Sequence, residues 1–223
     1  MISPTIEDYL KLIYKLQTSQ GKATTSAVAQ GMGVSPASAT SMIKKLAEMA
    51  YVHHTPYQGV ELTPAGEKIA LEVLRHHRLI ELYLAEALGV PWDQVHEEAH
   101  RLEHAISEDL EDRIAEALGH PTTDPHGHPI PTKEGLMADR SRDRLSDLGP
   151  GQSGLVSCVE DGDASLLRYL GDLGLYPHTD VTVVARAPFD GPLTIRVGKV
   201  EHSIGQQVAD QVFVDLLPPR RVA

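Results

Sequence analysis

The sequence has few of the residues that mark several common protein classes. Its 223 residues include one Cys, one Trp and two Phe. A single cysteine, Cys158, excludes a disulfide framework and a zinc site built from cysteines. No run of about 18 apolar residues is present, so we expect no membrane span. The N-terminus lacks the basic and apolar regions of a secretory signal peptide, and we expect a cytoplasmic protein.

Basic residues are also scarce, since 31 Asp and Glu outnumber 20 Lys and Arg and give a formal net charge of −11. The acidity is not uniform along the chain. Residues 1–70 carry six Lys against five Asp and Glu, whereas residues 71–223 carry 14 basic and 26 acidic residues. The first part is therefore able to face phosphate, and the second part suits cations.

The first 70 residues have the order of elements of a winged helix-turn-helix. Hydrophobic periodicity predicts three helices, at residues 6–18, 25–31 and 36–49. Alternating apolar residues predict a hairpin, with strands at residues 51–55 and 59–63 and a turn at 56–58. Ser35 followed by Pro36 is a typical helix start. This order predicts that the third helix enters the major groove of DNA.

The third helix presents small polar residues on its outward side, which a helix that only covers a core does not need. The candidate DNA-binding residues near its start are Ser35, Pro36, Ala37, Ser38, Thr40 and Ser41. Lys44 and Lys45 are expected to bind phosphates. The alternative is a small helical domain with no nucleic-acid role.

Histidine and carboxylate side chains are concentrated in the next segment. Periodicity predicts a helix from Pro64 to Leu88 and another that begins before His96 and ends near Leu118. On one continuous helix, four residues would fall within an arc of about 100°: His96, His100, Glu103 and His104. His77 and Glu81 are spaced i, i+4 on the preceding helix. Imidazole and carboxylate donors suit a divalent transition ion, although a solvated polar face is the alternative.

The rest of the chain predicts a dimer and a second type of fold. Both long helices carry apolar residues on more than one side, so we expect a homodimer. Residues 120–131 contain four prolines, which predicts a fixed loop in which His126 and His128 are not ligands. Residues 139–152 are expected to form a linker. Residues 153–223 predict five short strands and a helix at 164–173, which is typical of a small β-barrel.

Several motifs resemble the diphtheria toxin repressor and manganese transport regulator family of metal-dependent transcriptional repressors. The segments that carry the resemblance are residues 6–10, 34–38, 62–66, 77–81, 97–104 and 124–131. The last part is similar to the Src-homology-3-like domain of ferrous-transport accessory proteins, in residues 170–177 and 187–197.

The resemblance implies a mainly α fold with a small β-barrel. The expected domains are a winged helix-turn-helix at 1–70, a helical metal-binding and dimerisation domain at 71–138, a linker at 139–152 and the barrel at 153–223. It also implies two metal positions, which could share ligands. One would use Asp8, His100, Glu103 and His104. The other would use His77, Glu81, His96 and a barrel carboxylate, with Asp163 nearest to the family position and Glu160 and Asp161 as alternatives.

Three positions depart from the family pattern, and they affect which metal ion we expect to bind. Iron-type members have Met and Cys where this chain has Asp8 and His100. Manganese-type members share Asp8 but have Glu where this chain has Lys11 and His100. The carboxylate of Asp8 favours Mn²⁺, whereas the imidazole of His100 favours Fe²⁺, Co²⁺ or Zn²⁺. We therefore expect Mn²⁺, with Fe²⁺ second. The resemblance implies that this metal is the corepressor of a protein that binds palindromic operators of metal-uptake genes.

Two other function classes remain open at this stage. One is a winged-helix regulator that responds to a small organic ligand. The other is a helical metal-carboxylate enzyme or metal-storage protein, which would favour Glu-x-x-His pairs on two helices. Only one such pair, Glu97 and His100, occurs in the central segment, and no nucleophile–base pair or phosphate loop is evident. We therefore do not expect an enzyme.

Overall fold

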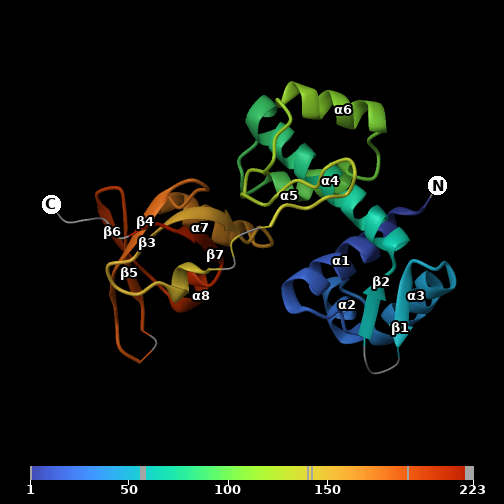
Figure 1. Cartoon of the computed structure of the whole chain (residues 1–223), viewed down its shortest axis with the longest axis horizontal. Coiled ribbons are helices and arrows are strands. Elements are labelled where there is room, and N and C mark those ends of the chain that lie inside the picture. Colours follow the sequence, from blue (N-terminus) through green and yellow to red (C-terminus); the bar gives the residue numbers. More distant parts are fainter. Residues whose placement is uncertain (1, 56–58, 140, 142, 190, 219–223) are drawn as a thin grey trace. The chain divides into compact units, whose positions relative to one another are not determined.

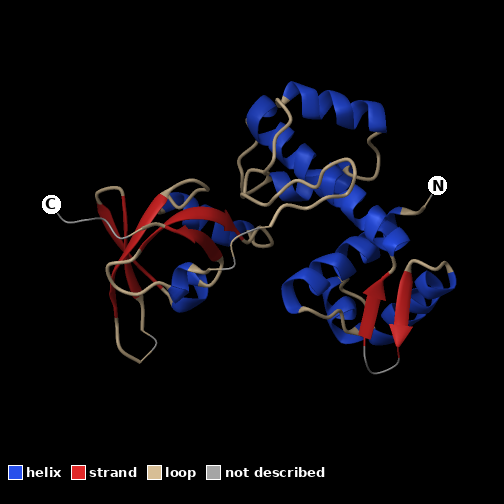
Figure 2. Ribbon diagram, viewed as in Figure 1, coloured by secondary structure: helices blue, strands red, loops and turns tan. Residues whose placement is uncertain are grey.

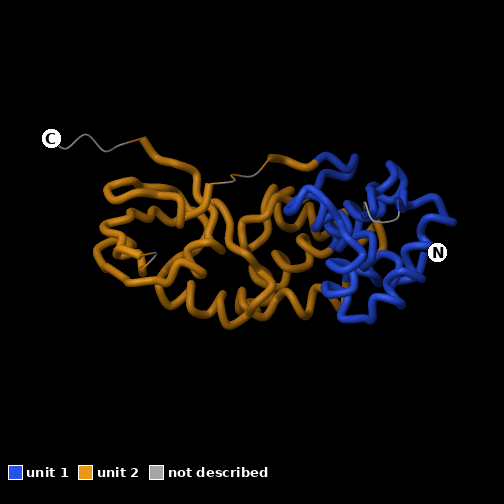
Figure 3. Tube along the Cα trace, turned by 90° about the horizontal axis from the view of Figure 1, so that it is seen from below, with its two compact units in different colours: residues 1–76, 103–106, 131–136 blue, residues 77–102, 107–130, 137–223 orange. Residues whose placement is uncertain are grey.

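The structure is a computed structural model that describes residues 2–55, 59–139, 141, 143–189 and 191–218. These residues divide into two compact units (Figure 3). Unit 1 comprises Met1–His76, Glu103–Ile106 and Pro131–Leu136, and unit 2 comprises His77–Leu102, Ser107–Ile130 and Met137–Ala223. Of the described helices, none combines the length and apolar character that crossing a membrane needs. The turn expected at 56–58 lies outside the described residues.

Within unit 1, three helices and a two-stranded antiparallel hairpin precede the first part of α4 (Pro64–Leu88) (Figure 1). The preceding elements are α1 (Pro4–Gln20), α2 (Thr25–Gly31), α3 (Pro36–Glu48), β1 (Val52–Thr55) and β2 (Gly59–Leu62). The predicted elements are confirmed, with ends shifted by at most two residues. The Ser35 hydroxyl accepts the N–H of Ser38 and caps α3. Buried Leu10, Ile43 and Leu46 pack in one core, which leaves the opposite side of α3 exposed.

The central helices differ from the prediction in one respect. The helix α4 (Pro64–Leu88) is confirmed and contributes residues to both units. The expected single helix after it is two helices, α5 (Val95–Leu102) and α6 (Glu108–Ala117). Ser107 starts α6 because its hydroxyl accepts the N–H of Leu110 at 3.3 Å. Glu103 and His104 therefore follow the end of α5, and the prediction that four metal ligands share one helical face was wrong.

The C-terminal part of unit 2 is a five-stranded antiparallel sheet with short helices beside it (Figure 2). Its strands are β3 (Ser153–Val159), β4 (Asp180–Arg186), β5 (Leu193–Val197), β6 (Val200–Ile204) and β7 (Val212–Leu216), in the order β6-β5-β4-β3-β7. The helices are α7 (Ala164–Asp172), α8 (Gln206–Ala209) and the 3₁₀ turn η1 (Leu145–Asp147). All five predicted strands are confirmed. Among the described strands, β6 and β7 do not pair to close a barrel.

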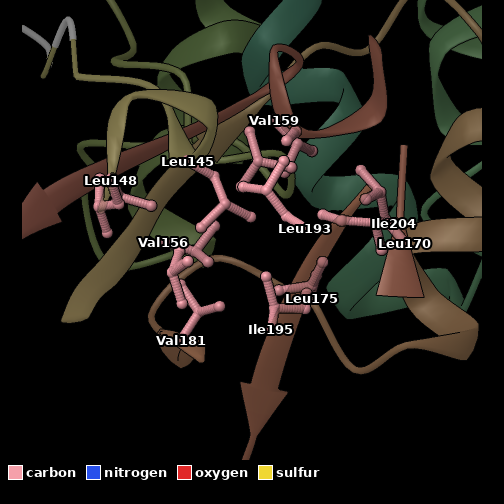
Figure 4. Close-up of a cluster of buried hydrophobic side chains, with 14 of the residues drawn as sticks. Leu145, Leu148, Val156, Val159, Leu170, Leu175, Val181, Leu193, Ile195 and Ile204 are labelled. Atoms are coloured by element: carbon pink, nitrogen blue, oxygen red, sulfur yellow. The ribbon is translucent and has the colours of Figure 1, made fainter. Parts of the chain in front are cut away.

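The core of this sheet includes part of the expected linker. Leu145 and Leu148 are buried beside Val156, Leu193 and other side chains of the sheet (Figure 4). Both leucines lie in the segment 139–152. Two apolar residues in a polar stretch give no periodic pattern, so the sequence alone did not show that they are buried.

Candidate metal centres

Three of the predicted ligands converge in unit 1, and we call them the first centre. The Nε2 atom of His104 lies 3.0 Å from Oδ1 of Asp8 and 3.3 Å from Oε1 of Glu103. These three ligand atoms lie within 4.8 Å of one another. One imidazole nitrogen and two carboxylate oxygens form a donor set that suits a divalent transition ion. His100, the fourth ligand that the family resemblance implies, is an exposed residue of α5 in unit 2 and remains a prediction.

Two further side chains of α1 contact the first centre. The Nδ1–H of His104 donates to Oε2 of Glu7 at 2.6 Å, which leaves Nε2 to face Asp8. The ammonium of Lys11 donates to Oε1 of Glu103. Burial lowers the pKa of Lys11, and the Glu103 carboxylate opposes this effect. We assigned no role to Glu7 or Lys11 from the sequence, although a lysine inside the buried stripe of α1 was an available indication.

A second centre in unit 2 brings together His77, Glu81 and His96. Oε1 of Glu81 lies 3.0 Å from Nε2 of His77 and 3.0 Å from Nδ1 of His96. Glu81 is fully buried. Burial alone would raise the pKa of Glu81, but the charge of His77 and hydrogen bonds from both imidazoles hold it well below its usual range. The sequence prediction named all three residues, and the structure places them together.

Of the three carboxylates considered for the second centre, Asp161, one of the two alternatives to Asp163, lies beside it in the loop that follows β3. Oδ2 of Asp161 lies 3.9 Å from Nδ1 of His96. Asp163 is the N-cap of α7, where its Oδ1 accepts the N–H groups of Ser165 and Leu166. The hydrogen bond from the Ser165 side chain and these backbone bonds lower the pKa of Asp163. Capping occupies Asp163, so Asp161 is the carboxylate beside the second centre.

A further group of possible ligand atoms, which includes the loop residues His126 and His128, adjoins the second centre. Asp124, His126, His128 and Asp161 offer ligand atoms within 4.8 Å of one another. Nδ1 of His128 lies 3.7 Å from Oδ2 of Asp161, and Nδ1 of His126 lies 3.9 Å from Oε2 of Glu81. Among the described residues, both Nδ1 atoms and Oε2 of Glu81 are buried without a hydrogen-bond partner. Such atoms are costly to bury, and a cation would compensate them.

The loop that carries these histidines is fixed, as predicted. Oδ1 of Asp124 accepts the backbone N–H groups of His126 and His128 at 2.8 and 2.9 Å. Between them, Gly127 has a φ of +88°, and a Cβ atom there would lie 2.0 Å from the carbonyl oxygen of Ser157 in β3. The loop therefore rests against β3 through the backbone of Gly127. The His-Gly-His spacing was the available indication that His126 and His128 lie together.

The predicted DNA-binding residues lie on and before α3. Ser35, Pro36, Ala37, Ser38, Ser41, Lys44 and Lys45 are exposed, and Thr40 is half-buried. The hydroxyl of Thr40 donates to the carbonyl oxygen of Pro36 at 2.7 Å. Ser35 already caps the helix, which gives it a structural role in addition to the predicted contact. The exposed side of α3 thus carries small, mostly polar side chains in its N-terminal half and basic side chains in its C-terminal half.

Matches to three known domain families together cover most of the chain. Residues 1–60 match the iron dependent repressor N-terminal DNA binding domain, and residues 63–132 match the iron dependent repressor metal binding and dimerisation domain. Residues 144–216 match the FeoA domain. The iron-dependent repressor IdeR of Mycobacterium tuberculosis is 30% identical over 223 residues, which cover 95% of this chain and 96% of the relative.

Two further relatives are transcriptional regulators, and one of them is named for manganese. The transcriptional regulator MntR of Oceanobacillus iheyensis is 35% identical over 120 residues, which cover 54% of this chain and 81% of the relative. A solved manganese-dependent transcriptional repressor in complex with manganese is 37% identical, with a TM-score of 0.89 over 95% of this chain and all of that one. These relatives are DNA-binding regulators and not enzymes. The chain belongs to the diphtheria toxin repressor and manganese transport regulator family of metal-dependent transcriptional repressors.

Proposed function

We propose that Mn²⁺, or Fe²⁺ in second place, binds the two centres as corepressor, and that a homodimer then binds a palindromic operator of metal-uptake genes. The observation that carries this proposal is the first centre, where Asp8 meets a histidine 96 residues further along the chain. Asp8 belongs to the first helix of the DNA-binding segment. A cation shared by these residues would couple metal concentration to the order of that segment.

The coupling arises from charge and connectivity within unit 1. Without a metal ion, the carboxylates of Glu7, Asp8 and Glu103 repel one another, and the ammonium of Lys11 offsets this repulsion only in part. A bound divalent ion supplies two positive charges to this cluster. Asp8 and His104 would then be held together, which restrains α1 and the core it shares with α3. If the ordered state binds the metal a hundredfold more tightly, operator binding gains about 2.7 kcal/mol.

The ligand atoms of the first centre support the proposed preference for Mn²⁺ over Fe²⁺. The first centre offers two carboxylates and one imidazole, a mainly oxygen set that suits Mn²⁺. His100, one turn before Glu103, would add a second nitrogen and bring Fe²⁺ close behind. Relatives named as manganese-dependent and as iron-dependent repressors are consistent with both ions.

The dimer is supported by apolar residues exposed on the central helices. Leu88, Leu102 and Leu110 are exposed at the ends of α4 and α5 and the start of α6, all in unit 2. This segment matches the metal binding and dimerisation domain. Two recognition helices about 34 Å apart would read half-sites one DNA turn apart. Lys44 and Lys45 would bind phosphates, and the protein would act in the cytoplasm, where its operator lies.

The test begins with selection of binding sites from random duplex DNA in the presence of Mn²⁺. Affinity for the selected duplex is then measured by fluorescence anisotropy with Mn²⁺, Fe²⁺, Zn²⁺ or a chelator, at one fixed salt concentration because phosphate contacts depend on salt. We expect Mn²⁺ to tighten binding about a hundredfold, with little change on an unrelated duplex. Equally tight binding with the chelator would refute the metal switch and favour a regulator of another ligand.

A pair of substitutions distinguishes the roles of Asp161 and Asp163, which lie between β3 and α7. Asp161→Asn should weaken metal binding at the second centre about tenfold, because it removes a charged donor near His96. Asp163→Asn should leave metal binding unchanged and keep the cap of α7, since Asn is a good N-cap. Metal content and competition titration with a chelating dye measure the first effect, and thermal unfolding measures the second. Equal metal binding by wild type and Asp161→Asn would remove Asp161 from the centre.

A further inference from the structure

Lys11 differs from the other lysines of unit 1 because it is buried beside proposed metal ligands. Its side chain is 10% exposed, and its ammonium donates to Oε1 of Glu103, whose side chain is fully buried. An ammonium is costly to bury unless a carboxylate compensates its charge. Glu103 therefore already holds a cation in this structure, and that cation belongs to the chain itself.

The oxygen that Lys11 occupies is the one that faces the first centre. Nε2 of His104 lies 3.3 Å from Oε1 of Glu103, and it also lies 3.0 Å from Oδ1 of Asp8. An ion bound by His104 and Asp8 would therefore take this same oxygen as its next donor. A protonated amine has no lone pair to offer and repels a second cation. Lys11 and a divalent ion thus compete for one carboxylate oxygen.

We propose that Lys11 is a resident cation of the first centre, which neutralises Glu103 until a divalent ion displaces it. The inference rests on the proposed function. Three carboxylates, those of Glu7, Asp8 and Glu103, are opposed by one ammonium, so the cluster keeps a net charge of −2 when His104 is neutral. That charge still attracts a divalent ion, but less strongly than −3 would. Lys11 therefore raises the metal concentration at which the protein responds. In the metal-free protein it compensates the buried negative charge of Glu103.

Metal affinity of substituted proteins tests the competition. The titrations use Mn²⁺ against a chelating dye in full-length protein carrying His96→Ala, which disables the second centre so that the first one is measured. We expect Lys11→Met to lower the Kd for Mn²⁺ by about tenfold or more, because a repelling charge is removed. Lys11→Arg keeps the charge and should stay near the parent value. A Kd for Lys11→Met within twofold of the parent, or a higher one, would overturn the inference.

A matched control separates contact from general charge. Lys15 lies one turn further along α1, and none of the described ion pairs joins it to Glu103. Lys15→Met makes the same change of net charge and should alter the Kd by less than about threefold. Equal effects of Lys11→Met and Lys15→Met would show long-range attraction alone and would contradict displacement from Glu103.

Amine labelling of the wild-type chain provides a second measurement that does not depend on the stability of a variant. Lysines are acetylated briefly with and without Mn²⁺, and the extent at each position is read by mass spectrometry. We expect Lys11 to react several-fold faster with Mn²⁺, because displacement frees its amine, while Lys44 and Lys45 on α3 serve as references. An unchanged rate at Lys11 in metal-saturated protein would overturn the inference.

The variant Asp8→Ala distinguishes a failure of the Lys11 inference from a failure of the proposed metal site. If Asp8→Ala weakens Mn²⁺ binding but Lys11→Met does not tighten it, the first centre stands and only the role of Lys11 is refuted. If neither substitution changes the Kd, the first centre is not a metal site, and the proposed function loses its switch.

Discussion

Asp8→Ala is expected to abolish most of the Mn²⁺-dependent gain in operator affinity, reducing it from about a hundredfold to a few-fold. Asp8 is the single ligand of the first centre that α1 supplies, so its removal breaks the link between the metal and the DNA-binding segment. Its side chain is only partly buried and does not belong to the apolar core. Glu103 is a poorer choice, because its removal would leave buried Lys11 without its carboxylate.

The measurement compares operator affinity with Mn²⁺ and with a chelator for wild type and variant at one salt concentration. Glu67→Ala is a matched control, since it removes one negative charge from an exposed position in the first turn of α4. The control should keep the full metal response. Binding of the chelated proteins to nonspecific duplex should be the same for all three. An Asp8→Ala protein that keeps its hundredfold response would show that the first centre does not control DNA binding.

Local patterns predicted most of the fold. The Ser35-Pro36 start of α3, the periodicity of α4 and the alternation in the sheet are properties of neighbouring residues, and each gave the correct element. The family resemblance supplied what spacing could not, namely that Asp8 belongs with Glu103 and His104. Geometry on one helical face had grouped His96 with these residues, whereas the structure places His96 with His77 and Glu81 in unit 2.

The remaining differences between prediction and structure concern contacts between distant segments. Asp161 and Asp163 are two residues apart in an acidic loop, and only the capping of α7 shows which carboxylate is engaged. His126 and His128 were set aside because a rigid, proline-rich loop is usually structural. Hydrogen bonds to Asp124 fix the loop, and both imidazoles are buried, with Nδ1 of His126 3.9 Å from Oε2 of Glu81 and Nδ1 of His128 3.7 Å from Oδ2 of Asp161. Neither fact is encoded in the local pattern, since each depends on which strand the loop packs against.

Gly127→Ala is expected to lower the free energy of unfolding by about 2–5 kcal/mol. The left-handed conformation of Gly127 alone costs an L-residue about 1–2 kcal/mol. A Cβ atom would also lie 2.0 Å from the carbonyl oxygen of Ser157, a backbone atom of β3 that has little freedom to move. The loop must therefore shift away from β3, and the hydrogen bond from the N–H of Val159 to the carbonyl oxygen of His126 would be strained or lost.

Gly119→Ala separates the two causes of this loss. Gly119 has a φ of +72°, close to that of Gly127, but a Cβ atom there would meet no heavy atom within 4 Å. Its substitution should cost only the conformational part, about 1–2 kcal/mol, and leave metal binding unchanged. Because His126 and His128 flank Gly127, Gly127→Ala should also weaken metal binding at the second centre. Thermal unfolding and metal competition measure both effects, and equal losses in the two variants would show that the contact with β3 does not support that centre.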